Sequence, residues 1–564
     1  MLHHTPLIAT IVAGLGLAFV VNLGIQSERL RSERDRALSA EAEARTVSDF
    51  LLELFKVADP GESRGETVTA RELLERGGEL IRTRLQDQPE AQTALLSTLA
   101  DVHLNLGLRQ RAVDLHRQAL EQRLATFGPE HPLTAAARDR LGDALRQAGR
   151  IEESESQLRQ GLATRQALLP ADDPAVADSL NNLGLVLSES SHFDEAEPLL
   201  RRSLEIRLAR LGPDDPNTLV SRSNLGQLLM KEGRYDDAEG QLQEVADRRL
   251  ALFGEDHPKS ALSLHHLATL HSREGRIEEA EAEFQRALRI WRKVLPPTHP
   301  MLASSLNNLA FLYHDQYRLA EAEPLYKETM EMDRATSGTD SVSFAYTLNN
   351  LGSLYEDEGR YEEAEDLFRQ SLELRRRLLG DDNPSTVSMI YNLGRLAYRK
   401  GDLDSAANRL QEAWEWQDTH LPADDPKRAR TLVLRGSVAR DLGDLVESEA
   451  LLLEAEEIYR HGRSDDHASL GLLQLELAET YAASPQPARC RSALESARDH
   501  IERPGSSPFQ RSRLHLTDAA CQAALGLPEE AAKSLRTARD LLPESLRADS
   551  YWARQIRQRL AALP

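Results

Sequence analysis

The chain has 564 residues, more than a single hydrophobic core supports, so it consists either of several domains or of a repeat array. Aromatic residues make up 5% and charged residues 28% of the sequence, which favours helices over sheets. With 69 Lys and Arg against 91 Asp and Glu, the net charge of −22 argues against binding to nucleic acid or to anionic membrane surfaces. The two cysteines, Cys490 and Cys521, are too few for a disulfide framework.

A short tail, residues 1–6, precedes an apolar segment at the N-terminus. Residues 7–25 contain no charged side chain, and their length matches a hydrocarbon core of roughly 30 Å. A cleavable signal peptide is the alternative interpretation. The tail has no Lys or Arg, however, and no A-x-A-like site follows the segment, so we expect a single transmembrane helix.

The side of the membrane on which the rest of the chain lies stays open. Arg29, Arg31, Arg34 and Arg36 directly follow the span, and the positive-inside rule therefore places the large C-terminal part in the cytoplasm. A resemblance given below implies the opposite side.

Residues 26–68 are predicted to form a juxtamembrane helix and a linker. Residues 61–65 match the G-x-S-x-G pattern of a nucleophilic serine, but Pro60 precedes them and no strand does, so a flexible turn is expected. Thr69 to Glu72 form a capping box, which predicts a capping helix over residues 69–91.

Prolines reveal a repeat with a step of 42 residues over residues 92–468. The proline ladder consists of Pro132, Pro174, Pro216, Pro258, Pro300, Pro384 and Pro426. A glycine ladder has the same step and comprises Gly107, Gly149, Gly233, Gly275, Gly359, Gly401 and Gly443, with Ser191 and Tyr317 on two exceptional rungs. A third ladder of alanine and serine runs from Ala112 to Ser448.

Each repeat is interpreted as a helical hairpin. Proline after Asp, His or Asn begins the first helix, because its missing N–H is not needed there. The glycine provides a left-handed turn, after which acidic residues begin a longer second helix. Such a hairpin cannot bury its apolar face alone, so neighbouring repeats must stack.

The repeats carry a family resemblance. The N-N-L-A/G pattern at Leu306 to Ala310, the L-G pair of the first helix and the A-E spacing of the second helix resemble tetratricopeptide repeats, and the 42-residue form resembles kinesin light chains. The resemblance implies an all-α fold, an α-solenoid with a right-handed superhelix of helical hairpins, here with one N-terminal transmembrane helix. Residues 469–564 are predicted to form divergent repeats and a C-terminal cap.

A second resemblance concerns Val47 to Ile81, which are similar to the juxtamembrane part of bacterial serine/threonine kinases. It implies a single-pass protein of the bacterial inner membrane and an association with such a kinase. No Gly-rich loop, H-R-D or D-F-G motif is present in the sequence.

No motif indicates catalysis, a cofactor or a metal site. His257, His265, His266 and His271 lack the spacing of three or four residues that places two ligands on one helix face. Cys490 lies on the ladder of small residues and is interpreted as a structural thiol. Arginine runs such as Arg375 to Arg377 are interpreted as solvated faces.

The asparagine pairs locate a candidate binding surface. At 100° per residue, Asn181 lies roughly 110° from the centre of the buried leucine stripe of its helix. By resemblance, this face of the first helices lines the concave surface of the array. The same step along the array gives the candidate partner-binding residues Asn181, Ser223, Gln227, His265, Asn307, Phe311, Asn349, Ser353, Tyr391, Arg395, Tyr398 and Arg440.

These residues have two kinds of predicted chemistry. Amide and hydroxyl groups suit the backbone of an extended peptide. Tyr391, Arg395, Tyr398 and Arg440 form a cationic and aromatic group that suits a carboxylate. The second asparagine of each pair, such as Asn182, is predicted to bond across the seam between hairpins.

The sequence therefore predicts a membrane-anchored, non-catalytic scaffold that binds a protein or an extended peptide in its concave groove. The alternative is the sensory or scaffold half of a bacterial serine/threonine kinase system whose catalytic domain is absent from this chain. An exported repeat protein with a cleaved signal and a groove that is merely kept hydrated are further interpretations.

Overall fold

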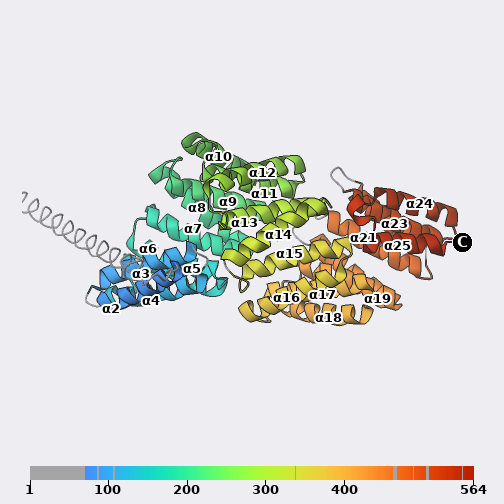
Figure 1. Ribbon diagram of the computed structural model, residues 1–564, viewed down its shortest axis with the longest axis horizontal. Coiled ribbons are helices and arrows are strands. Elements are labelled where there is room, and N and C mark those ends of the chain that lie inside the picture. Colours follow the sequence, from blue (N-terminus) through green and yellow to red (C-terminus); the bar gives the residue numbers. More distant parts are fainter. Residues whose placement is uncertain are drawn as a thin grey trace, which may run out of the picture. The chain divides into compact units, whose positions relative to one another are not determined.

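The computed structural model describes residues 70–85, 88–105, 108–336, 338–461, 467–486, 488–502, 507–548 and 550–563. Every regular element in these ranges is a helix, which confirms the predicted all-α repeat fold (Figure 1). No helix within the described ranges is long and apolar enough to span a bilayer. The predicted transmembrane segment 7–25 and the linker 26–68 lie outside the described residues.

The chain divides into two compact units, of which one ends at Pro213 and the other begins at Asp214. The helices of the first unit are α2 (Ala70–Arg84), α3 (Pro89–Asn105), α4 (Arg109–Phe127), α5 (Pro132–Gln147), α6 (Ile151–Leu168), α7 (Pro174–Glu189) and α8 (Phe193–Leu211). Here α3 packs on α4, α5 on α6 and α7 on α8 as consecutive hairpins.

The second unit continues the same alternation. It comprises α9 (Pro216–Lys231), α10 (Tyr235–Phe253), α11 (Pro258–Glu274), α12 (Ile277–Val294), α13 (Pro300–Asp315), α14 (Leu319–Thr336), α15 (Val342–Glu358), α16 (Tyr361–Leu379), α17 (Pro384–Lys400), α18 (Leu403–His420), α19 (Pro426–Leu442) and α20 (Leu445–His461). Its C-terminal part consists of α21 (His467–Ala483), α22 (Ala488–Ile501), α23 (Pro508–Ala524), α24 (Pro528–Leu541), the 3-10 helix η1 (Glu544–Leu546) and α25 (Tyr551–Ala562).

The first helix of most repeats begins at a rung of the proline ladder. The residue before each proline is the N-cap, and its side chain accepts a hydrogen bond from a free backbone N–H of the first turn. Asp173 accepts from the N–H of Ala175 at 2.8 Å, and His257 accepts from the N–H of Lys259 at 3.1 Å. The D/H/N-P dipeptide thus encodes both the cap and the first helical residue.

The turn within each hairpin uses the left-handed backbone conformation. The glycine rungs have positive φ angles, for example 78° at Gly149 and 83° at Gly359. Ser191 and Tyr317, the two exceptional rungs, are the residues other than glycine with positive φ among the described ones, at 63° and 55°. The turn between the two helices of a hairpin therefore requires the left-handed conformation even where the residue is not glycine.

In several hairpins the two helices approach closely at a glycine of the first helix. A Cβ atom on Gly352 would lie 2.8 Å from a ring carbon of Phe368, and one on Gly184 would lie 2.7 Å from Cγ of Leu200. The facing ladder residues Ala196 and Ala364 are fully buried. Close contact at these small residues fixes the position of each second helix against its first.

The C-terminal part contains two hairpins and one helix that the sequence analysis did not separate from them. The pairs α21 with α22 and α23 with α24 pack as hairpins, and α25 follows them. A disulfide joins Cys490 in α22 to Cys521 in α23, with a Cα–Cα distance of 5.8 Å. The interpretation of Cys490 as a structural thiol was therefore wrong, because the fold brings two cysteines of consecutive hairpins together in a disulfide.

We predict that Gly352→Ala destabilises the second unit by about 1–3 kcal/mol, because the added methyl group overlaps the buried ring of Phe368. Gly240→Ala in α10 is the matched control, since a Cβ there meets no atom within 4 Å. It should raise stability by up to about 1 kcal/mol through helix propensity. Denaturant unfolding of both variants measures the difference, and equal effects would contradict the close-approach interpretation.

Candidate functional site

Asparagine pairs on the first helices link consecutive repeats of the second unit. The amide of Asn350 donates to Oδ1 of Asn307 at 2.9 Å, and that of Asn392 donates to Oδ1 of Asn349 at 2.7 Å. Asn349 in turn donates to Asn350 of the same helix at 3.1 Å. These bonds confirm the predicted seam contact of the second asparagine, and they show that the first asparagine serves as its acceptor.

Histidines replace the asparagine pair in α11. His266 Nδ1 lies 3.0 Å from the hydroxyl of Ser223, and His265 Nε2 lies 3.5 Å from the amide of Asn308. The His265 ring packs against Phe284 and Trp291 at centroid distances of 5.5 and 5.7 Å. Burial lowers the pKa of His265 to about 4 and that of His266 to about 3, so both rings are neutral at pH 7.

A cavity of about 340 Å³ opens on this face of the second unit, and we call it the aromatic hollow. Its lining residues come from the helices between α13 and α19. Phe311 and Tyr346 lie at its surface with 56% and 46% of their area exposed, which is unusual for aromatic side chains in a packed array. Of the predicted partner-binding residues, the hollow brings together Phe311, Asn349, Ser353 and Arg395.

The predicted residues of α17 and α19 are already engaged within the chain. Arg395 donates to both carboxylate oxygens of buried Glu356, at 2.7 and 3.0 Å. Arg440 donates to Glu476 at 2.7 Å and to the hydroxyl of Tyr398 at 3.0 Å. Although burial opposes ionisation, Arg440 and Arg513 hold the pKa of Glu476 at about 2, so this carboxylate stays charged.

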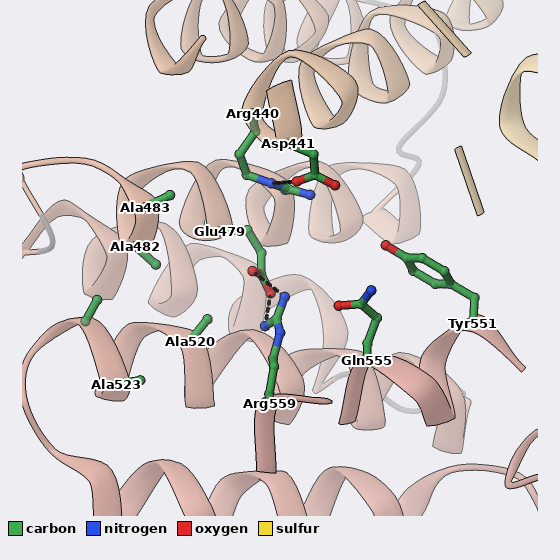
Figure 2. A pocket seen from close by; sticks show the side chains of 11 residues that line it. Arg440, Asp441, Glu479, Ala482, Ala483, Ala520, Ala523, Tyr551, Gln555 and Arg559 are labelled. Carbon is green, nitrogen blue, oxygen red and sulfur yellow. Dashed lines mark hydrogen bonds and ion pairs between the residues drawn. The ribbon is translucent and has the colours of Figure 1, made fainter. Parts of the chain in front are cut away.

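A second cavity, of about 490 Å³, lies beside α25 (Figure 2). Alanines of α21 and α23 form its floor, and Tyr551, Gln555 and Arg559 of α25 form one wall. Arg559 points at Glu479 and makes two bonds of 2.9 Å to its carboxylate. Asp441 pairs with Arg440 at 2.8 Å, so the charges around this cavity neutralise one another.

The helix α25 folds back onto the face that the sequence analysis assigned to a partner. Arg554 donates to the hydroxyl of Tyr361 at 2.7 Å and to the carbonyl oxygen of Arg399 at 3.2 Å. The rings of Tyr551 and Tyr398 lie 6.0 Å apart. The chain itself therefore occupies the surface around Tyr398 and Arg440.

The remaining predicted residues are less accessible than expected. Asn181 in the first unit and Ser223 and Tyr391 in the second are at most 5% exposed. Gln227 donates to the carbonyl oxygen of Ser223 at 3.4 Å, one turn away on the same helix. Helical geometry alone therefore placed the side chains of Asn181, Ser223 and Tyr391 on an accessible face, although neighbouring side chains cover them.

Sequence reasoning missed Tyr346, Arg375 and Arg430, which also line the aromatic hollow. The interpretation of Arg375 as part of a solvated face was wrong, since it is 2% exposed. A signal was present in the sequence, because Arg165, Arg207 and Arg249 precede Arg375 by multiples of 42 residues. All three are buried as well.

A family model described as tetratricopeptide repeat matches residues 91–167, 175–249, 216–290, 264–335 and 343–415, and a second model with this description matches residues 391–463. No curated protein matches the chain.

Several solved structures are similar to parts of the chain. BtubC (BKLC) from P. vanneervenii is 24% identical over 41% of this chain and 91% of its own, with a TM-score of 0.35. TPR-like repeats assigned to a kinesin light chain of Podosopora anserina are 25% identical over 37% of this chain and 96% of their own, with a TM-score of 0.31. A tetratricopeptide repeat protein from Parabacteroides merdae is 19% identical over 54% and 98%, with a TM-score of 0.36.

We predict that the second unit loses stability as the pH falls from about 6.5 to about 4. His265 and His266 are neutral in the fold but take up protons when unfolded, because their folded pKa values lie below the ordinary 6.5. The loss amounts to about 1.4 kcal/mol for each pKa unit of the shift. Urea unfolding between pH 4 and 8 measures it.

The double variant H265N/H266N restores the asparagine pair of other repeats and should remove most of this pH dependence. His257→Asn is the matched control, because asparagine serves as the equivalent N-cap at Asn383. A control variant that flattens the pH profile as much as the double variant would contradict the assignment to His265 and His266.

Proposed function

Because the chain belongs to the tetratricopeptide repeat family, we propose that it is a non-catalytic scaffold that binds a protein or an extended peptide at the aromatic hollow. The exposed pair of Phe311 and Tyr346 carries the proposal, since large exposed aromatic side chains are typical of binding surfaces. The proposed site is narrower than the sequence-based one, because α25 covers the face around Tyr398 and Arg440.

The polar lining of the hollow supports an extended peptide as the ligand. Asn349, Asn350 and Asn392 carry amide groups, each with donor and acceptor atoms, and Ser353 and Ser388 add hydroxyl groups. A peptide backbone in an extended conformation presents unpaired N–H and C=O groups that need such partners. Phe311 would pack against an apolar side chain of the ligand.

We further propose that residues 7–25 anchor the chain in a membrane and that the repeats lie on its oxidising side. The disulfide between Cys490 and Cys521 supports this side, because disulfides persist in oxidising compartments and are rare in the cytosol. The four arginines after the span favour the cytoplasmic side. The implied association with a serine/threonine kinase stays a hypothesis, as most of the residues that carry this resemblance lie outside the described ones.

We predict that Phe311→Ala weakens peptide binding by roughly tenfold, corresponding to about 1.4 kcal/mol. The ligands are peptides selected from a random-sequence display library against the full-length protein, and their dissociation constants are measured by fluorescence anisotropy. Leu453→Ala on the second helix α20 is the control, since Leu453 is similarly exposed, at 44%. Selected peptides that bind F311A as tightly as the unchanged protein would place the site elsewhere.

We predict that Cys490 and Cys521 are joined in intact cells. Acid-quenched cells are denatured and treated with a maleimide of high mass, which should shift the protein only after reduction. Because the disulfide spans 31 residues, C490A/C521A should lower the free energy of unfolding by about 3–4 kcal/mol. Labelling of both thiols without reduction would contradict the oxidising location.

A further inference from the structure

The aromatic hollow is positively charged in a chain whose net charge is −22. Arg375, Arg395 and Arg430 are among its lining residues, and none of these described lining residues is acidic. The cavity beside α25 differs, since Asp441 and Glu479 balance its two arginines. The hollow therefore has a local charge opposite to that of the whole protein.

Arg375 is one of the two sources of this charge. Its side chain donates from Nη1 to the carbonyl oxygen of Ser385 at 2.8 Å, and its guanidinium lies 4.4 Å from the ring centre of Tyr346. Its buried Nε has no hydrogen-bond partner, and no described carboxylate lies within ion-pair distance. Burial lowers the pKa of Arg375, which reflects the cost of a buried charge without a counterion.

Two of the three equivalent arginines that precede it have the counterion that Arg375 lacks, whereas Arg249 donates to the hydroxyl of Ser263 at 3.2 Å. Arg165 lies 2.9 Å from the carboxylate of Asp139, and Arg207 lies 2.6 Å from that of Asp178. A buried arginine in this repeat is therefore compatible with an acidic partner. At Arg375 the chain supplies no such partner, although the side chain borders an open cavity.

Arg430 adds a second uncompensated charge. It is exposed on α19, and its guanidinium lies 4.7 Å from the ring centre of Tyr391. No ion pair joins it to a described acidic residue. Arg395, by contrast, is neutralised by its bidentate bond to Glu356. The excess charge of the hollow thus comes from Arg375 and Arg430.

Neutral donors complete the site. Ser385 lies in the first turn of α17, where the helix dipole also favours a negative group, and Ser388 lies one turn after Pro384 and donates its hydroxyl to the carbonyl oxygen of that residue at 2.9 Å. The hydroxyl of Tyr346 lies 2.9 Å from that of Ser385, so both hydroxyl groups border the same part of the hollow. Arginine and hydroxyl donors together are typical of sites that bind carboxylate or phosphate groups.

We propose that the aromatic hollow binds an anionic group of the peptide, a carboxylate or a phosphate monoester, with Arg375 and Arg430 as its ion-pair partners. This inference rests on the proposed function, because it specifies the ligand of the same site. It adds that the ligand carries a negative charge next to the apolar side chain that contacts Phe311.

The test uses the full-length protein and four sets of otherwise uncharged random decapeptides, arrayed on a surface. The central residue is glutamate, phosphoserine, glutamine or lysine. We expect the glutamate or the phosphoserine set to bind about tenfold better than the glutamine set, and the comparison of these two identifies the anion. The lysine set should bind least.

Arg430→Gln should reduce the preference for the anionic set about tenfold and leave the glutamine set unchanged. Arg435→Gln is the matched control, because it removes the same charge from the same helix. The side chain of Arg435 packs on Trp414 and does not line the hollow. Arg375→Gln should have the same effect as Arg430→Gln. Because Arg375 is buried, thermal unfolding is used to show whether the Arg375→Gln variant folds. If it does not, the result for Arg430→Gln alone decides whether the anion site exists.

The outcomes separate the two proposals. Peptides that bind without a preference for a negative charge, or a loss of preference in R435Q equal to that in R430Q, would overturn the anion site and leave the peptide groove intact. Absence of binding by all four sets would overturn both.

Discussion

The close approach of two helices at a glycine is the contact on which the rest of this structure depends. At Gly184 and Gly352 the first helix has no side chain, and Leu200 and Phe368 of the second helix fill that space. The contact holds the second helix on one side of the hairpin, so that the opposite face of the first helix remains free. The asparagine ladder and most lining residues of the aromatic hollow lie on first helices of the second unit, while Tyr326 and Arg375 line the hollow from second helices.

The features that recur in most repeats could be predicted from the sequence. Proline with its capping residue, the left-handed turn at Ser191 and Tyr317, and the seam bond of Asn350 each depend on residues at a fixed spacing. Local chemistry determines all three, and repetition makes them visible. The predicted position of Phe311 on the accessible face follows from the same helical geometry.

Other features could not be predicted, because they depend on contacts between residues far apart in the sequence. The bond from Arg554 to Tyr361 and the disulfide between Cys490 and Cys521 form only once the C-terminal helices have packed. The burial of Arg375 depends on Tyr346 and Ser385 of the two flanking first helices. From sequence alone, a run of charged residues is interpreted as solvent-exposed, because the helices that cover it are not known.

The first-helix face of the second unit has two parts that differ in whether their buried charges have ion-pair partners. Around α25, buried charges are matched, as Glu479 is with Arg559 and Glu476 with Arg440 and Arg513. A ligand that displaced α25 would remove Arg559 from buried Glu479, at a cost of several kcal/mol for this broken pair. At the aromatic hollow the balance is reversed, because a negative group would supply the counterion that Arg375 lacks. The cost of leaving a buried charge unpaired therefore disfavours ligand binding near α25 and favours binding of an anion at the hollow between α13 and α19.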